Sequence, residues 1–254
     1  MTVVAAYRGI KGSLNAMMAD TVCSARDKPT EAAFWTDKLA LLYGNTYATG
    51  VGDADIINGV RLVADFLDPD RPNFRDPATI DAVLGAVERL WAVRAGAGGQ
   101  RFGSKGSVLF VCNRSDVFYW VCGYDNETRR FERPRAPHEV GEGECVVFWG
   151  SDRFTVRRPQ LEPHRDLLQS DPFKTIAKLI CAVDSDAREK GMSGLLYALD
   201  GRFSAVALPH KTSTPLTRLR PFSLPEWLVR ENGAEMLSML EDPEFMAYAL
   251  PPRA

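Results

Sequence analysis

The chain has 254 residues, of which 45% are hydrophobic and 25% are charged, as is typical of a soluble globular protein with one domain or two small ones. Its 31 Lys and Arg residues against 33 Asp and Glu residues leave a formal net charge of -2, which argues against nonspecific binding to nucleic acid. The apolar content excludes intrinsic disorder, and no apolar run approaches the roughly 20 residues that a membrane-spanning helix needs.

The first part of the chain predicts two pairs of strands. Residues 2–7 are apolar and partly β-branched, a turn with two glycines follows, and residues 13–20 are again apolar, so a tight hairpin is expected. Residues 34–49 predict a second pair of strands, separated at Tyr43-Gly44-Asn45.

Two helices are predicted next. Apolar residues recur at helical spacing from Ile56 to Leu67, and Pro69 ends this pattern. A second stripe begins at Asp76-Pro77, with proline in the first turn, and extends to Trp91. The glycine-rich segment 96–106 that follows lacks the residues required by a dinucleotide or phosphate-binding loop, so we expect a flexible linker.

The second part of the chain predicts further strand pairs and fewer helices. Because the strands come in hairpin-sized pairs, antiparallel sheets with helices on their outer faces are favoured over a parallel sheet. The predicted elements are a hairpin of residues 108–112 and 117–122, an exposed loop over 129–144, a strand over 145–149, a helix over 173–190, a hairpin of residues 195–199 and 203–208, and a final helix over 225–240.

Several classes of site and compartment are disfavoured. Too few apolar residues precede Arg8 for the core of a signal peptide, so a cytoplasmic protein is expected. The three histidines are isolated, which argues against a metal site, and no cofactor is expected. The cysteines are odd in number and form no CxxC pair, so we expect mostly buried thiols at Cys23, Cys112, Cys122, Cys145 and Cys181.

Thr2 is the candidate nucleophile. Removal of the initiator Met1, which is favoured before a small residue, would leave a hydroxyl and a free α-amine on the same residue. A threonine hydroxyl is a weak nucleophile until a base takes its proton. An α-amine, with a pKa of about 7.7–8.0, is close enough to neutrality to be that base.

Five short motifs occur in a characteristic order over residues 2–208. They are the first hairpin with Ala19-Asp20-Thr21 at its end, Lys38 before an apolar strand, the small-residue turn Thr49-Gly50-Val51-Gly52-Asp53-Ala54-Asp55, Gly150-Ser151-Asp152 after a strand, and Lys190-Gly191-Met192-Ser193-Gly194 after a helix. In order and spacing this chain resembles the proteasome β-subunit family of N-terminal-nucleophile hydrolases, and in particular its bacterial type, such as HslV and Anbu.

The resemblance implies an α+β fold. For residues 1–208 it implies a four-layer αββα sandwich of two antiparallel sheets flanked by helices. Residues 209–254, which are punctuated by prolines, are then a C-terminal extension with a helix. The resemblance also implies a threonine peptidase in a homo-oligomer, acting on peptides or unfolded proteins, with neither nucleic acid nor membrane as a partner. Whether a separate ATPase takes part is not indicated.

The resemblance implies a role for each charged residue of the site. Thr2 would attack a peptide carbonyl and form an ester with it. Lys38 would assist by lowering the pKa of the Thr2 hydroxyl or by carrying its proton, and Asp20 would pair with Lys38 and hold the ammonium group in place. The structural alternatives are a turn cap for Asp20 and a solvated strand-edge position for Lys38.

Serines and glycines complete the implied site. Ser151 and Ser193 would orient the α-amine through hydrogen bonds, and a backbone N–H between Gly50 and Gly52 would bind the oxyanion. Serine is also common beside glycine in ordinary turns, and the glycines are equally consistent with a tight connection.

One position departs from the pattern of active members, where an aspartate precedes the second serine by three residues. Here Lys190 occupies that position, and its positive charge would either lower the pKa of the α-amine or mark a silent site. Two alternatives to a peptidase therefore stay open: an amidase, acyl-transferase or peptide ligase with a small dedicated substrate, and a catalytically silent scaffold subunit.

Overall fold

The computed structural model describes residues 2–24, 32–52, 55–66, 73–96, 106–125, 127–150, 155–157, 175, 179 and 202–223. In chain order the elements are β1 (Thr2–Tyr7), β2 (Leu14–Asp20), β3 (Val22–Ser24), β4 (Ala32–Trp35), β5 (Ala40–Leu41), β6 (Tyr47–Val51), α1 (Asp55–Phe66), α2 (Pro77–Gly96), β7 (Gly106–Cys112), β8 (Val117–Asp125), β9 (Arg130–Phe131), β10 (His138–Glu139), β11 (Cys145–Gly150), β12 (Thr155–Arg157), β13 (Arg202–Pro209) and β14 (Thr217–Ser223).

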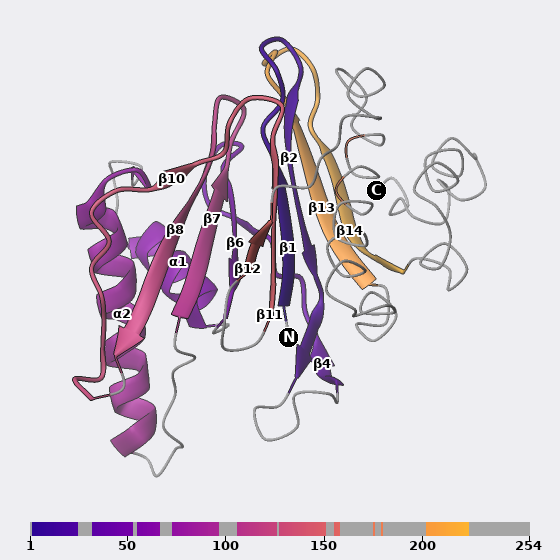
Figure 1. Ribbon diagram of the computed structural model, residues 1–254. Helices are drawn as coiled ribbons and strands as arrows, with labels where there is room; N and C mark the ends of the chain where they lie inside the picture. The colour runs from indigo at the N-terminus through magenta and orange to yellow at the C-terminus, as the bar shows by residue number, and fades with distance from the viewer. Residues whose placement is uncertain are drawn as a thin grey trace.

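The first sheet has six strands in the order β12-β11-β1-β2-β13-β14, and all of its pairs are antiparallel (Figure 1). The predicted hairpin of β1 and β2 is confirmed, with Val4 opposite Ala19. All seven residues of β2 are buried, which is expected of a central strand with both faces covered.

The second sheet has the order β10-β8-β7-β6-β5, with β9 paired to β8 outside this path. The predicted hairpin of β7 and β8 is confirmed. The prediction of an exposed loop over 129–144 is partly wrong, because β9 and β10 both pair with β8 and the side chains of Phe131 and Val140 are buried. The many charged residues of this segment predict an exposed loop, and the pattern gives no sign that Phe131 and Val140 are buried.

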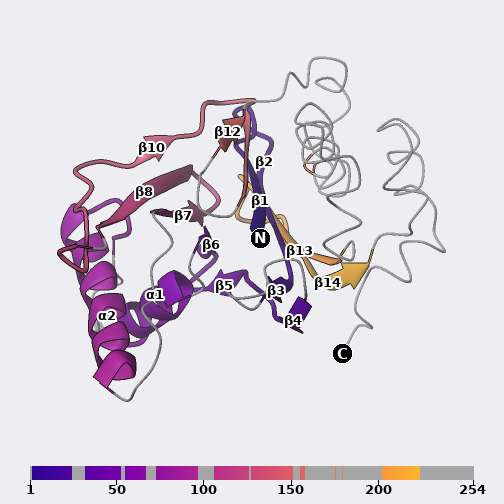
Figure 2. The same cartoon turned by 60° about the horizontal axis from the view of Figure 1, so that its bottom comes forward.

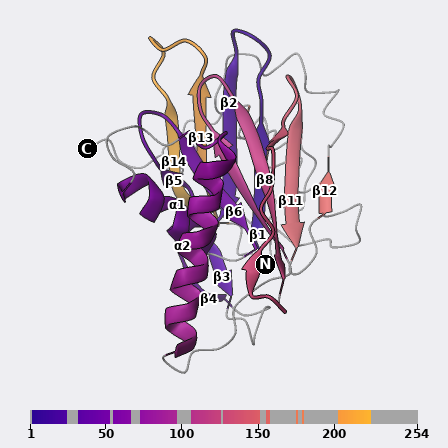
Figure 3. The same cartoon turned by 90° about the vertical axis from the view of Figure 1, so that its left-hand side faces the viewer.

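The two sheets pack face to face, and the helices cover the outer face of the second sheet (Figure 3). Val4 and Met17 of the first sheet share a core with Val108 and Phe110 of the second. The opposite face of the second sheet shares a separate core with α1 and α2. These helices begin and end close to the predicted positions, and Pro77 is the first residue of α2.

The other face of the first sheet is also buried, since Ala5, Met18 and Ala205 have no exposed surface. Thr175 and Leu179 are helical and buried, within the predicted third helix. The rest of that helix, the predicted strand over 195–199 and the final helix lie outside the described residues. Antiparallel sheets with helices on an outer face are therefore observed, whereas the four-layer sandwich stays a prediction.

The first sheet continues beyond residue 208. Strand β14 lies within the segment assigned to the C-terminal extension, yet it pairs with β13 and forms the edge of the sheet. The division into residues 1–208 and 209–254 stays a prediction. No helix in the described part of the chain is both long and apolar enough to cross a bilayer.

Three of the five cysteines, Cys112, Cys122 and Cys145, have described side chains, and all three are buried, as predicted. Burial raises the pKa of the Cys122 thiol to about 12, and it raises the pKa of Cys112 as well. The side chains of Cys23 and Cys181 lie outside the described part. Among the described residues, His, Cys, Asp and Glu side chains form no group suited to a metal ion.

Candidate active site

Thr2 is the first residue of β1, a strand held between β2 and β11. It is partly buried and lies opposite Gly150, the last residue of β11. The start of β1 lies at the same end of the molecule as β3 and β4 (Figure 2). The sheet therefore fixes the backbone of Thr2 on a central strand and leaves its side chain at the strand end.

Asp20 is the last residue of β2, beside the start of β1, and its side chain is completely buried. The backbone pairs of β1 and β2 begin only at Val4. The N–H of Val3 donates instead to Asp20 Oδ1 at 2.7 Å. The carboxylate thus completes the end of the hairpin and satisfies a buried backbone donor.

Lys38 joins these two residues. Its Nζ donates to Asp20 Oδ2 at 2.7 Å and to Thr2 Oγ1 at 3.3 Å, and its side chain is 10% exposed. The N–H of Thr36 donates to the carbonyl of Thr21 at 2.8 Å, which brings the segment before Lys38 to the end of β2. Three residues that are distant in the sequence therefore form one contiguous polar cluster.

Burial and the neighbouring ammonium act in opposite directions on Asp20. Desolvation raises the pKa of its carboxyl above the ordinary value, whereas the charge of Lys38 and its hydrogen bond lower it. A lysine that is paired with a buried carboxylate and touches a hydroxyl oxygen can stabilise negative charge on that oxygen. The cluster has the geometry to assist ionisation of the Thr2 hydroxyl.

The two candidate oxyanion glycines differ in what their backbone requires. Gly52 follows β6 and has a φ of 101°, in the region that favours glycine. At Gly50 an added Cβ would come no closer than 3.4 Å to Val108 O, so a side chain fits there. Val51, between them, shares a core with Val4 of β1, which places this turn across the sheets from the first strand.

The remaining predicted residues of the site are Ser151, Ser193 and the departure at Lys190, and all three lie outside the described residues. Their roles stay predictions. The structure brings Thr2, Asp20 and Lys38 together, and it places Gly50 and Gly52 at the end of β6.

One set of contacts near Lys38 was not predicted from the sequence. Arg218 Nη2 donates to Asp37 Oδ2 and, at 3.3 Å, to the carbonyl of Leu39, the two residues that flank Lys38. Asp37 stands next to a candidate residue, but nothing in the local pattern indicates its partner 181 positions away. That partner depends on the register of β13 and β14.

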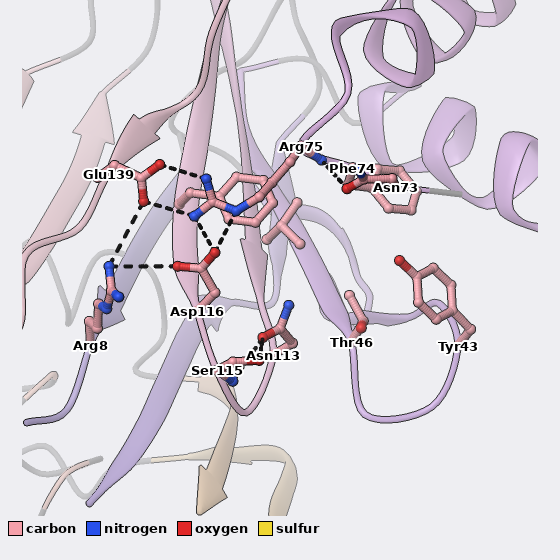
Figure 4. A pocket seen from close by; sticks show the side chains of 12 residues that line it. Arg8, Tyr43, Thr46, Asn73, Phe74, Arg75, Asn113, Ser115, Asp116 and Glu139 are labelled. Carbon is pink, nitrogen blue, oxygen red and sulfur yellow. Dashed lines mark hydrogen bonds and ion pairs between the residues drawn. The ribbon is translucent and has the colours of Figure 1, made fainter. Parts of the chain in front are cut away.

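A cavity of about 550 Å³ lies elsewhere (Figure 4). Its lining includes Arg8, which follows the end of β1 opposite to Thr2. Arg75 donates to both carboxylate oxygens of Glu139, at 2.7 and 2.8 Å, and to Asp116, and Arg8 lies 3.6 Å from Asp116. Because these charges are paired with one another, we interpret the network as structural: it links the segments that carry Arg8, Arg75, Asp116 and Glu139.

No family model and no curated protein matches the sequence. Solved structures are similar over most of the chain at low identity. A mutant of Anbu from Hyphomicrobium sp. strain MC1 is 12% identical, with a TM-score of 0.48 and 98% of each chain covered. Anbu (ancestral beta-subunit) from Yersinia bercovieri is 13% identical, with a TM-score of 0.42, and 100% of this chain and 99% of that chain are covered. BPH from Thiobacillus denitrificans in complex with epoxomicin is 14% identical, with a TM-score of 0.41, 83% of this chain and 100% of that chain covered.

Proposed function

We propose that the protein is a threonine-type peptidase that cleaves amide bonds with Thr2 as its nucleophile. The observation that carries this proposal is the position of Lys38 Nζ, which contacts both Thr2 Oγ1 and the buried Asp20 carboxylate. A strand-edge lysine with no role beyond solubility would extend into solvent, whereas this side chain is 10% exposed.

Lys38 and Asp20 prepare the nucleophile. The carboxylate neutralises the lysine and fixes its direction, because a charge-assisted hydrogen bond is shorter and stronger than a neutral one. The ammonium group then favours the ionised form of the Thr2 hydroxyl through its positive charge. Lys38 thus acts on the hydroxyl directly, and Asp20 acts through Lys38.

The proton acceptor in this proposal is the α-amine of Thr2, which is free only after Met1 has been removed. The Thr2 oxygen forms a bond to the substrate carbonyl carbon while its proton passes to the α-amine. The C–N bond of the substrate then breaks, and the leaving amine takes that proton. Water then attacks the ester carbon and gives a proton to the α-amine. The ester C–O bond breaks, Thr2 Oγ1 takes that proton from the α-ammonium group, and the acid product leaves.

The surroundings of the nucleophile complete the proposed site. A backbone N–H in the turn from Gly50 to Gly52 binds the oxyanion, where a fixed donor contributes about 2.7–4 kcal/mol in a comparable enzyme. Ser151 and Ser193 orient the α-amine. At the level of the whole protein we propose the four-layer αββα sandwich, a homo-oligomeric assembly, and peptides or unfolded proteins as substrates.

The test is hydrolysis of fluorogenic peptides by protein that lacks Met1 and is purified free of host proteases. Thr2→Ala is expected to reduce turnover to background, and Thr2→Ser, which keeps a hydroxyl and an α-amine, is expected to retain part of it. Thr128→Ala is the matched control, because that threonine lies in an exposed turn and bonds only to Asp125 in the described contacts. Unchanged turnover by Thr2→Ala would refute the proposal.

A second readout separates a peptidase from a transferase that uses the same nucleophile. An added primary amine competes with water for the acyl group, and the products are identified by mass spectrometry. Products that carry only the hydroxyl of water support the peptidase. Predominant transfer to the added amine would overturn hydrolysis as the main reaction and leave Thr2 as the nucleophile.

A further inference from the structure

We propose that Arg218 is a positioning residue that holds Lys38 against Thr2 by clamping the two residues on either side of it. This inference rests on the proposed function and extends it to a residue on β14. Arg218 acts on Lys38 through its two neighbours, by hydrogen bonds to the Asp37 carboxylate and the Leu39 carbonyl.

The clamp closes the turn in which Lys38 lies. Arg218 Nη2 donates to Asp37 Oδ2 and, at 3.3 Å, to the carbonyl of Leu39. The N–H of Leu39 donates at 3.0 Å to Asp37 Oδ1, so the two flanking residues are also bonded to each other. Asp37 therefore uses both carboxylate oxygens to fix the turn, one within it and one toward Arg218.

The sheet provides a rigid frame for this clamp. Asp20 of β2 pairs with Phe203 of β13, and Val206 of β13 pairs with Arg218 of β14. Lys38 is thus held at its ammonium end by Asp20 of β2 and through its two neighbours by Arg218 of β14, with only β13 between these strands. The two attachment points belong to one sheet, so their separation is fixed by backbone pairing.

The guanidinium group is partly protected from water. The Arg218 side chain is 20% exposed, and its guanidinium carbon lies 5.5 Å from the centre of the buried Tyr47 ring. Nη1 is buried and has no hydrogen-bond partner in the part of the chain that the structure describes. Within the described part of the chain, the guanidinium group therefore donates from Nη2 to Asp37 and Leu39, the two residues that flank Lys38.

Loss of the clamp is expected to affect the chemical step and to spare substrate binding. Without Arg218, the Asp37 carboxylate and the Leu39 carbonyl lose a shared donor, and the turn gains freedom. Lys38 Nζ then spends less time within reach of Thr2 Oγ1. Small displacements of a catalytic group lower the reaction rate strongly. Because the clamp acts on the position of Lys38 Nζ, its loss is expected to lower kcat and to leave KM nearly constant.

The experiment compares Arg218→Met, Arg218→Lys and Arg133→Met in full-length protein without Met1. Arg133 is a matched control because it also pairs with carboxylates, but on α2, away from Lys38. The rate of Thr2 acylation by a β-lactone is followed by intact mass, and kcat and KM are measured with a fluorogenic peptide.

Arg218→Met is expected to lower the acylation rate and kcat at least tenfold, with KM within twofold of wild type. Arg218→Lys, which retains a cation near Asp37, is expected to recover most of the rate, and Arg133→Met to match wild type. Wild-type acylation and kcat in Arg218→Met, or a loss that Arg133→Met reproduces, would overturn the inference.

Asp37→Asn weakens the same contact from the side of Asp37, and it tests the inference if Arg218→Met does not fold. It keeps the oxygen that accepts from Leu39 and removes the charge that faces Arg218, so it is expected to slow acylation in the same manner. Wild-type acylation in this variant would overturn the inference. Failure of the proposed function is distinguishable, because wild-type protein would then carry no lactone on Thr2.

Discussion

Asp20 is a fully buried carboxylate whose main charged partner is the Lys38 ammonium at 2.7 Å. Removing both charges of a buried pair is often neutral for stability, whereas removing one partner typically costs about 3–5 kcal/mol, because the other charge is left without compensation. A buried pair at the end of a hairpin is therefore weak evidence for stability. Its contact with the Thr2 hydroxyl is the reason why we propose a chemical role for it.

A cycle of variants separates these two roles. Asp20→Asn and Lys38→Met are each expected to lower the free energy of unfolding by about 3–5 kcal/mol, and the double variant by clearly less than the sum. Hydrolysis is expected to fall by about 10²-fold or more in all three, because the group beside the Thr2 hydroxyl is lost or misplaced. Urea unfolding measures the free energy of unfolding, and a fluorogenic peptide measures the rate of hydrolysis. A double variant with wild-type hydrolysis would contradict the assignment.

The stability of the protein is expected to depend on pH through Asp20. Burial raises the pKa of its carboxyl above the ordinary value of 3.8, and the Lys38 charge opposes this shift. The folded state therefore binds the proton more tightly than the unfolded state, so stability falls as pH rises from 3.8 through the raised pKa and is constant beyond it.

The check is the free energy of unfolding against pH for wild type and Asp20→Asn, taken as a difference so that other groups cancel. The free energy of unfolding of the wild type minus that of Asp20→Asn is expected to fall as pH rises from 3.8 through the raised pKa of Asp20. A difference that moves in the opposite direction would mean that the attraction of Lys38 outweighs desolvation.

At the scale of elements, α1 and α2 pack through a close approach at Gly59. A Cβ at Gly59 would lie 2.5 Å from Val87 Cγ2 and 3.0 Å from the carbonyl of Val83. Trp91 of α2 also donates to the carboxylate of Asp55 at 2.8 Å, which ties the start of α1 to α2. The start of α1, which follows the candidate oxyanion donors at the end of β6 in the sequence, is positioned by its contacts with α2.

Gly59→Ala and Gly85→Ala form a matched pair within these helices. Gly85 is helical too, but its Cβ would meet only the mobile end of Arg89 at 3.6 Å. Gly85→Ala is expected to stabilise the protein by up to about 1 kcal/mol through helix propensity. Gly59→Ala is expected to destabilise it by about 1–3 kcal/mol, because the added methyl group overpacks the interface. Equal effects in thermal unfolding would contradict the packing argument.

The elements that could be predicted from the sequence are those whose signal is local. The hairpin of β1 and β2 and both helices carry their own periodicity and turn residues. Strands β9 and β10 have only two residues each and form because β8 offers an edge. Strand β14 contains Pro221, which is tolerated at a sheet edge and interrupts the pattern that would have revealed it.

At the scale of the whole molecule, the candidate site is assembled from segments that no local pattern connects. The resemblance to a known family indicated Thr2, Asp20 and Lys38, and the sheet register shows why they meet. Asp20 ends the strand beside β1, and the Thr36–Thr21 hydrogen bond returns the chain to that end. Arg218 could not be predicted, because its contact requires the order β2-β13-β14.

Covalent labelling tests whether Thr2 is a nucleophile without assuming a substrate. The protein is incubated with a β-lactone, and its intact mass, N-terminal sequence and peptide map are recorded. We expect a chain that begins at Thr2 and gains the mass of one lactone on that residue, with no gain in Thr2→Ala. A chain that begins at Thr2 and carries no adduct there, or equal labelling of Thr2→Ala, would contradict the role of Thr2 as nucleophile.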